Sequence, residues 1–212
     1  VNSNFKITGE YTYMTYLAHQ PGGLTDKQFN LDPSKSIRNR NWFKVNWNLA
    51  SLSLDWKLSP SARISWMNFG LIADRITVGY LGQINRADPL TERDVLGDEY
   101  KNFGSELRFL KRYQLLKNTS VFLVGARYYQ GKTIRKQGLG DTTSKANFNY
   151  LNPNNLEHSD YTFPSKNLAL FSENIFQLTK KLSLTPGVRF EYISTSAKGY
   201  YKETNRDLAG NI

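Results

Sequence analysis

Residues 167–192 constrain the fold of this chain more than any other stretch. They read NLALFSENIFQL, then TKKL, then SLTPGVRFEY. In the second arm apolar side chains alternate with polar or small ones, and side chains with a period of two point to opposite faces of a strand. The pattern predicts a β-hairpin that has a polar turn at one end and an aromatic residue at the other. Its apolar face is opposite a face that carries Arg189 and Glu191, as in the hairpins of membrane β-barrels.

Composition excludes several classes of protein. The 212 residues include no Cys, which excludes disulfides, thiolate metal sites and Cys nucleophiles. The mean hydropathy is −0.55 and no run of about 18 apolar residues occurs, so a helical membrane protein is excluded, but a β-barrel is not. The N-terminus VNSNFKITGEY has no signal-peptide pattern. We therefore interpret the chain as an internal piece of a longer protein.

Further stretches of alternating side chains predict five strands upstream of the hairpin. A change of phase within the second of these strands predicts a bulge near Ala50, and Pro186, which lacks an N–H, predicts another in the hairpin. From Ser194 onward we expect a polar tail that begins a loop. The five upstream strands are expected at about 5–18, 42–58, 63–73, 103–110 and 120–129.

The connections between these strands alternate in length. Residues 19–42, 74–102 and 130–166 form long polar segments, whereas 59–62, 112–119 and 179–182 form short links. Outer-membrane barrels have short turns on one side and long loops on the other. We therefore predict an all-β fold, an antiparallel transmembrane β-barrel of which about seven strands are present. A passive porin or autotransporter-like barrel, and a soluble β-sandwich binding module, remain as alternatives.

The stretch FSENIFQLTKKLSLTPGVRFEY resembles the barrel of TonB-dependent outer-membrane receptors. GGLTDKQF, SIRNRNWF, DRITVGYLGQINR and ARYYQGKTIRKQG are similar to the ferric citrate receptor branch of that family. The resemblance implies that residues 1–212 are part of a larger barrel with a plugged lumen, without the plug domain, the TonB box or the C-terminal strands. It also implies active uptake of an iron chelate through a Gram-negative outer membrane, in contact with its lipid and driven by the TonB–ExbB–ExbD complex.

Arginines supply the candidate binding site. The resemblance implies that Arg75 and Arg93 hold an iron–citrate complex, and it identifies no third family arginine near residues 160–166. Guanidinium groups suit this polyanion because they bind carboxylates through two hydrogen bonds. Secondary candidates are Arg38, Arg40 and Gln83. The alternative is that Arg75 and Arg93 are solvated loop residues paired with acidic neighbours, and that Arg38 and Arg40 lie in a solvated turn.

Other functions have no support in the sequence. The net charge of +10 is scattered along the chain and no nucleic-acid-binding motif occurs, so we expect no nucleic-acid partner. His19 and His158 are far apart and lack metal-ligand spacing, and no catalytic motif is present. We therefore expect no enzyme activity, no metal site and no cofactor, since the iron arrives as a chelated ligand.

Overall fold

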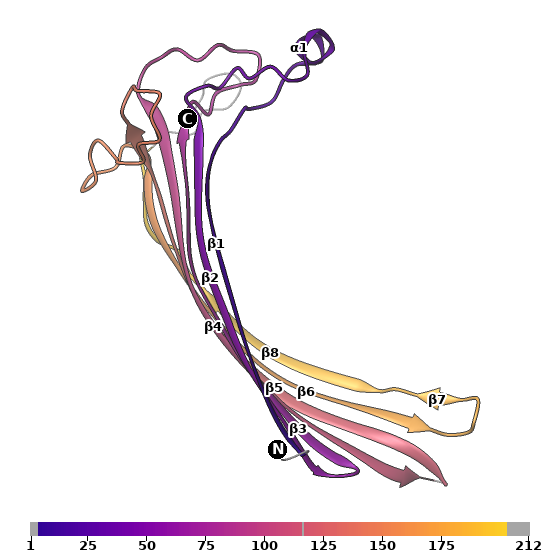
Figure 1. Ribbon diagram of the computed structural model, residues 1–212. Coiled ribbons are helices and arrows are strands. Elements are labelled where there is room, and N and C mark those ends of the chain that lie inside the picture. Colours follow the sequence, from indigo (N-terminus) through magenta and orange to yellow (C-terminus); the bar gives the residue numbers. More distant parts are fainter. Residues whose placement is uncertain (1–3, 116, 203–212) are drawn as a thin grey trace, which may run out of the picture.

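The computed structural model describes residues 4–115 and 117–202, which form one curved antiparallel sheet (Figure 1). Neighbouring strands follow the order of the sequence from β1 to β6, and the last three segments all pair with β6. One short helix, α1, lies in the first long loop. The elements are β1 Phe5–His19, α1 Asp26–Leu31, β2 Trp42–Ser59, β3 Ala62–Gly79, β4 Arg93–Leu115, β5 Asn118–Gly140, β6 Ser159–Gln177, β7 Ser183–Leu184, β8 Gly187–Thr195 and β9 Lys198–Tyr201.

The three segments β7, β8 and β9 are parts of a single seventh strand. Phe176 pairs with Leu184, Glu173 with Gly187 and Ser159 with Tyr201, so the register against β6 never changes. Pro186 interrupts the hydrogen-bond ladder without shifting it, and its carbonyl still accepts the Asn174 N–H at 3.0 Å. The bulge expected at Pro186 and the loop expected from Ser194 are therefore both wrong. The part of the expected tail from residue 203 lies outside the described residues.

The bulge expected near Ala50 is also wrong. Ala50 pairs with Tyr11 on one side and Gly70 on the other in an unbroken register, and the irregularity of β2 lies between Lys57 and Ser59. The phase of the sequence pattern changes because the apolar side chains of β2 move from one face of the sheet to the other along the strand. The backbone itself does not slip.

The central strands are longer than the sequence pattern predicts. Residues 74–79, 93–102 and 130–140 belong to β3, β4 and β5, so the loops between strands shrink to 80–92 and 141–158. These strand ends carry charged side chains on both faces, among them Arg75, Asp98 and Lys136. An alternating apolar pattern is absent there, although the backbone ladder continues.

The sheet has one apolar face and one polar face, set by strand register. One row of the apolar face runs Ile7, Leu54, Trp66, Leu107, Ala126, Leu170 and Phe190 across the seven strands. Phe190 is 70% exposed, and a large exposed apolar surface of this kind indicates contact with an apolar environment. The neighbouring row of the polar face runs Thr8, Ser53, Met67, Glu106, Arg127, Ala169 and Glu191.

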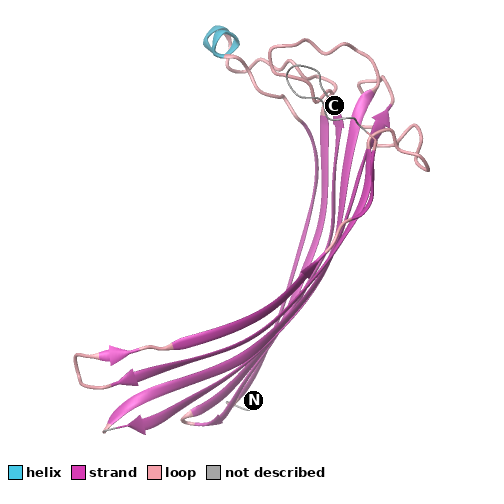
Figure 2. Cartoon of the chain, turned by 180° about the vertical axis from the view of Figure 1, so that it is seen from behind, coloured by secondary structure: helices cyan, strands magenta, loops and turns pink. Residues whose placement is uncertain are grey.

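All long loops lie at one end of the sheet and all short turns at the other (Figure 2). The described residues contain no second sheet packed on the first, which excludes a β-sandwich for this part of the chain. The architecture confirms the predicted partial antiparallel barrel. Within residues 4–115 and 117–202 no helix is long and apolar enough to cross a membrane.

Candidate functional site

Two arginines share one buried carboxylate on the polar face, near the loop end of the sheet. Strand register places Arg75 of β3, Asp98 of β4 and Arg135 of β5 side by side. Arg75 Nη2 lies 2.8 Å from Asp98 Oδ2, and Arg135 Nε lies 2.6 Å from Asp98 Oδ1. The Asp98 side chain is 2% exposed, whereas the two arginine side chains are 45% and 44% exposed. We name this trio the Arg–Asp–Arg cluster.

Aromatic rings flank the Arg–Asp–Arg cluster. Tyr100 donates a hydrogen bond from its hydroxyl to Asp98 at 3.2 Å, and its ring centroid lies 5.9 Å from the Arg75 guanidinium carbon. Trp47 stacks on Tyr100, with centroids 6.4 Å apart and an interplanar angle of 10°. On the other side Tyr161, which pairs with Arg135, stacks on Phe163. Tyr100 thus supports the Arg75 guanidinium while leaving part of it open.

The charge of the Arg–Asp–Arg cluster does not cancel. Two guanidinium groups face one carboxylate, so one positive charge is left uncompensated within the trio. Each guanidinium still has exposed N–H groups, and two such groups on one surface can bind a ligand that carries several carboxylates. The sequence identified Arg75, but it missed Arg135, because residue 135 lay in an expected loop. TIRKQG has no alternation of apolar and polar side chains that would have marked it as a strand.

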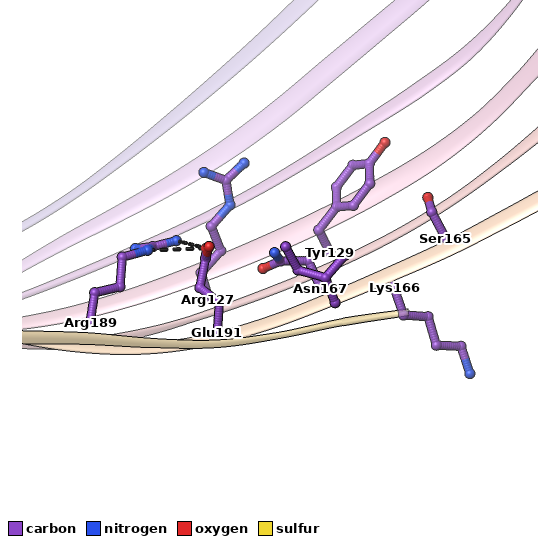
Figure 3. A pocket seen from close by; sticks show the side chains of 8 residues that line it. Arg127, Tyr129, Ser165, Lys166, Asn167, Arg189 and Glu191 are labelled. Carbon is purple, nitrogen blue, oxygen red and sulfur yellow. Dashed lines mark hydrogen bonds and ion pairs between the residues drawn. The ribbon is translucent and has the colours of Figure 1, made fainter. Parts of the chain in front are cut away.

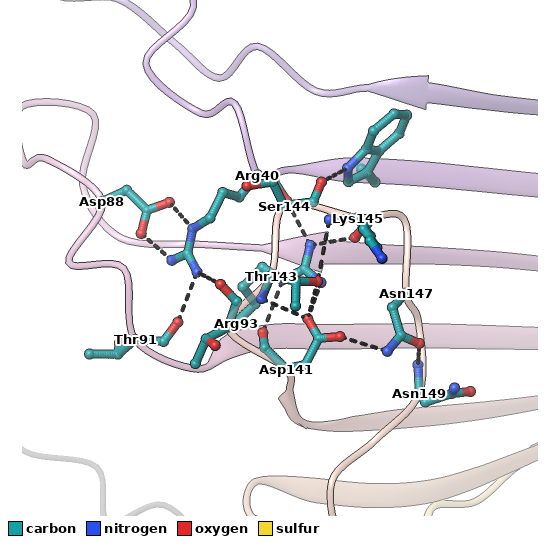
Figure 4. A network of polar contacts seen from close by, with 12 residues as sticks. Arg40, Asp88, Thr91, Arg93, Asp141, Thr143, Ser144, Lys145, Asn147 and Asn149 are labelled. Carbon is teal, nitrogen blue, oxygen red and sulfur yellow. Dashed lines mark hydrogen bonds and ion pairs between the residues drawn. The ribbon is translucent and has the colours of Figure 1, made fainter.

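Arg93 does not join Arg75. Its side chain is 0% exposed and lies under the loop 141–158, in a network of polar contacts shown in Figure 4. Arg93 Nη2 lies 2.5 Å from Asp141 Oδ1, and Arg93 Nη1 donates to the carbonyls of Arg40 at 3.0 Å and Lys145 at 2.9 Å. In this arrangement a ligand reaches Arg93 only if the loop 141–158 moves away.

Arg40 and Arg38 are buried in the same region. Arg40 forms an ion pair with Asp88 and donates to the carbonyls of Thr91 at 3.0 Å and Thr142 at 2.8 Å. It thereby joins the loops 20–41, 80–92 and 141–158 (Figure 4). We name Arg38, Arg40 and Arg93 the arginine clamp, because each one ties loops or strand ends together.

Arg38 does not lie in a solvated turn, because the residue is buried. Its guanidinium donates to the carbonyl of Gln83 at 2.8 Å and to that of Arg86 at 3.1 Å, and it lies 4.9 Å from the ring centroid of Tyr80. The Gln83 side chain is exposed in the loop 80–92. The acidic partners are not the sequence neighbours Asp74, Glu92 and Asp94 that the alternative interpretation implied, since Arg75 pairs with Asp98 and Arg93 with Asp141.

The carboxylates of the arginine clamp are held in their charged form. Desolvation raises the pKa of Asp141, but hydrogen bonds from Asn147, Thr143 and Arg93 outweigh it and lower the pKa to about 2. A hydrogen bond from Arg40 is the main cause that lowers the pKa of Asp88. Both carboxylates are therefore ionised at neutral pH and attract their arginines.

Farther from the loops, the polar face carries charge in self-contained pairs (Figure 3). Arg189 binds Glu191 two residues along the same strand and lies 5.4 Å from the Phe171 ring centroid. Glu106 pairs with Arg108 and lies 3.9 Å from Arg127. Among the described residues, no group of three or more His, Cys, Asp or Glu side chains is arranged to hold a metal ion.

Comparisons with known proteins agree with this architecture. A family model described as "TonB dependent receptor-like, beta-barrel" matches residues 1–211. A crystal structure of ferric citrate transporter FecA in the unliganded form superposes with a TM-score of 0.76 at 20% sequence identity. The match covers 93% of this chain and 28% of that chain, so this chain spans little more than a quarter of the transporter. A comparison with curated proteins found no match.

Proposed function

This chain belongs to the TonB-dependent receptor-like β-barrel family, and we propose that the protein containing it takes up a ferric chelate across a Gram-negative outer membrane. The apolar face of the sheet then contacts outer-membrane lipid, and the polar face lines the lumen. The long loops 20–41, 80–92 and 141–158 lie outside the cell. No catalytic step is assigned, and the iron enters as part of the chelate.

The single observation that carries this proposal is the Arg–Asp–Arg cluster. It presents two half-exposed guanidinium groups on the lumen side, just below the long loops, where an incoming chelate would first meet the barrel wall. A polycarboxylate chelate is the chemical class that this arrangement suits best. We propose ferric citrate as the ligand, which is also the ligand after which the similar transporter is named.

We assign the predicted binding residues different parts in this function. Arg75 contacts the chelate, together with Arg135. Arg38, Arg40 and Arg93 hold the loops that surround the entrance, and Gln83 in the exposed loop 80–92 is available as a hydrogen-bond donor. Uptake then requires movement of a plug, driven by the TonB–ExbB–ExbD complex, and both lie outside this chain.

The test is ferric citrate binding by the full-length receptor. We expect that Arg75→Ala combined with Arg135→Ala weakens binding at least about tenfold, because two charge-assisted contacts to carboxylates are lost. Isothermal titration with ferric citrate measures the change. The matched control is Arg63→Ala, since Arg63 is also half-exposed on the polar face and also paired with an aspartate, Asp55, but lies at the turn end of the sheet.

Two results would contradict the assignment. One is unchanged affinity in the double variant, and the other is an equal loss in the control. A neutral ferric hydroxamate serves as the second ligand, and binding of it as tightly as ferric citrate would argue against a polycarboxylate site. A passive porin remains the alternative function, and it predicts iron uptake that persists when the membrane is de-energised.

A further inference from the structure

Three lysines lie together on the apolar-face side of β4, β5 and β6, where that face turns polar. Lys101 of β4 and Lys132 of β5 are direct cross-strand partners. Lys166 of β6 pairs with Gln130, so it is the diagonal neighbour of Lys132. All three side chains are exposed, and Figure 3 shows Lys166 directed away from Arg127 and Tyr129 of the polar face. We name these residues the lysine cluster.

The lysine cluster directly continues the apolar surface. On β5 the same face carries Tyr128, then Gln130, then Lys132 in the direction away from the apolar band. On β4 Phe103 is the residue next to Lys101 on that face. Beyond these come Leu107 of β4 and Leu168 of β6, both about half-exposed. On β4 and β5 the face therefore passes from aliphatic through aromatic or polar residues to lysine, whereas on β6 Lys166 directly follows Leu168. This order matches the depth profile of a lipid, from acyl chain to headgroup.

The lysines have no protein partner that explains their proximity. Among the described residues, none of the three ammonium groups forms an ion pair or a hydrogen bond, and like charges directly across a sheet destabilise it. The nearest carboxylates, Asp74 and Glu99, face each other one row closer to the loops. An anion that approaches from the apolar band meets the lysines first.

We propose that the lysine cluster binds the phosphate group of a membrane lipid whose acyl chains lie along the apolar face of β4–β6. This inference rests on the proposed function only in requiring that the barrel is inserted in a membrane. The negative phosphate separates and neutralises the adjacent ammonium groups, while the chains cover Leu107 and Leu168. A lipid with more than one phosphate engages the three lysines most fully.

The experiment uses the full-length receptor, purified in a nonionic detergent and titrated with phosphatidylglycerol or with neutral phosphatidylcholine. Native mass spectrometry measures the lipid that stays bound. We expect phosphatidylglycerol to be retained in preference, and Lys101→Gln with Lys132→Gln and Lys166→Gln to lower its affinity at least about tenfold. The same three positions changed to Arg keep the affinity. The matched control changes three loop lysines, Lys27, Lys35 and Lys145, to Gln and leaves lipid retention unchanged.

Each contrary result is decisive. Equal retention of the two lipids, or an unaffected triple Gln variant, overturns the lysine cluster as a phosphate site. Full displacement of the lipid by millimolar inorganic phosphate overturns the role of the apolar face. Ferric citrate binding by the triple Gln variant is measured in parallel and stays unchanged, so failure of the lipid site is distinguished from failure of the proposed uptake function.

Discussion

Asp141 shows how one residue fixes a whole loop. It follows the end of β5 and gathers Arg93, Thr143 and Asn147, with Asn147 Nδ2 lying 2.6 Å from Asp141 Oδ2. The first contact reaches the buried end of β4, and the others turn the loop 141–158 back over the strand ends (Figure 4). The first part of the loop is therefore anchored by one ionised carboxylate, in addition to the contacts that Arg40 and Arg93 make with its carbonyls.

This dependence predicts a loss of order at acid pH. The pKa of Asp141 is about 2 in the folded protein, below the ordinary value of about 3.9. A group with a lowered folded pKa contributes stability that is present above its unfolded pKa and is lost as the pH falls through the folded one. We expect the amide protection factors of residues 141–158 in the full-length receptor, measured by hydrogen exchange, to fall between about pH 4 and pH 2.

The control for this prediction is Asp141→Asn. The amide keeps the size of the side chain but carries no charge, so protection of the loop is lower at neutral pH. Protection also falls less across that acid range, where Glu157 of the same loop, whose pKa is lowered as well, remains. An acid transition of the same size in the variant would show that another group controls the loop. Asp88 allows a separate test on the loop 80–92, because its ion pair with Arg40 holds that loop and does not involve Asp141.

The strands show which parts of the fold a sequence reveals. Alternation places β1 and β2 to within a residue of their observed ends, because apolar and polar side chains alternate along nearly the whole of both strands, even though the apolar face changes within β2. The same criterion does not detect β3 after about residue 73, β4 before about residue 103 or β5 after about residue 129. In these parts both faces of the strands carry polar side chains. Backbone hydrogen bonds extend a strand there without any hydrophobic signal.

The candidate site was predictable to the same extent. Arg75 stood out beside GYLGQ, but its partner Asp98 and its neighbour Arg135 are brought together only by strand register, over separations of 23 and 60 residues along the chain. Arg93 was predicted from the family resemblance, whereas its burial depends on how the loop 141–158 folds. A pattern of charges does not distinguish an exposed arginine from one that ties loops together.

The two faces of a strand predict opposite responses to the same substitution. Leu107 lies on the apolar face of β4, and Met67 lies on the polar face of β3 opposite Glu106, with exposed fractions of 49% and 41%. We expect Leu107→Arg to lower the free energy of unfolding by about 2–4 kcal/mol, as for a charge facing lipid near the middle of a bilayer. Met67→Arg gains a carboxylate neighbour and changes it by less than about 1 kcal/mol.

Urea unfolding of the full-length receptor in phospholipid vesicles measures both changes. Equal losses in the two variants would mean that the faces are not in different surroundings. A larger loss for Met67→Arg would reverse the assignment of lumen and lipid.

At the scale of the whole molecule, this chain is an arc and not a closed barrel. Within the described residues β1 pairs only with β2, and β8 pairs only with β6, so each end of the sheet has a strand with one unpaired edge. Nearly every residue of β1 is exposed. Among residues 4–115 and 117–202, no further layer of strands or helices covers either face of the sheet.

An arc of this kind is predicted to be unstable by itself in water. Unpaired edges recruit other strands, and the exposed apolar band favours association, so we expect isolated residues 1–212 to aggregate in buffer without detergent. Analytical ultracentrifugation measures the effect. The same chain in detergent micelles is expected to stay dispersed, because micelles cover the apolar face. A cooperatively folded monomer in detergent-free buffer would contradict the assignment of that face to lipid, because a face adapted to lipid does not stay exposed to water in a stable monomer.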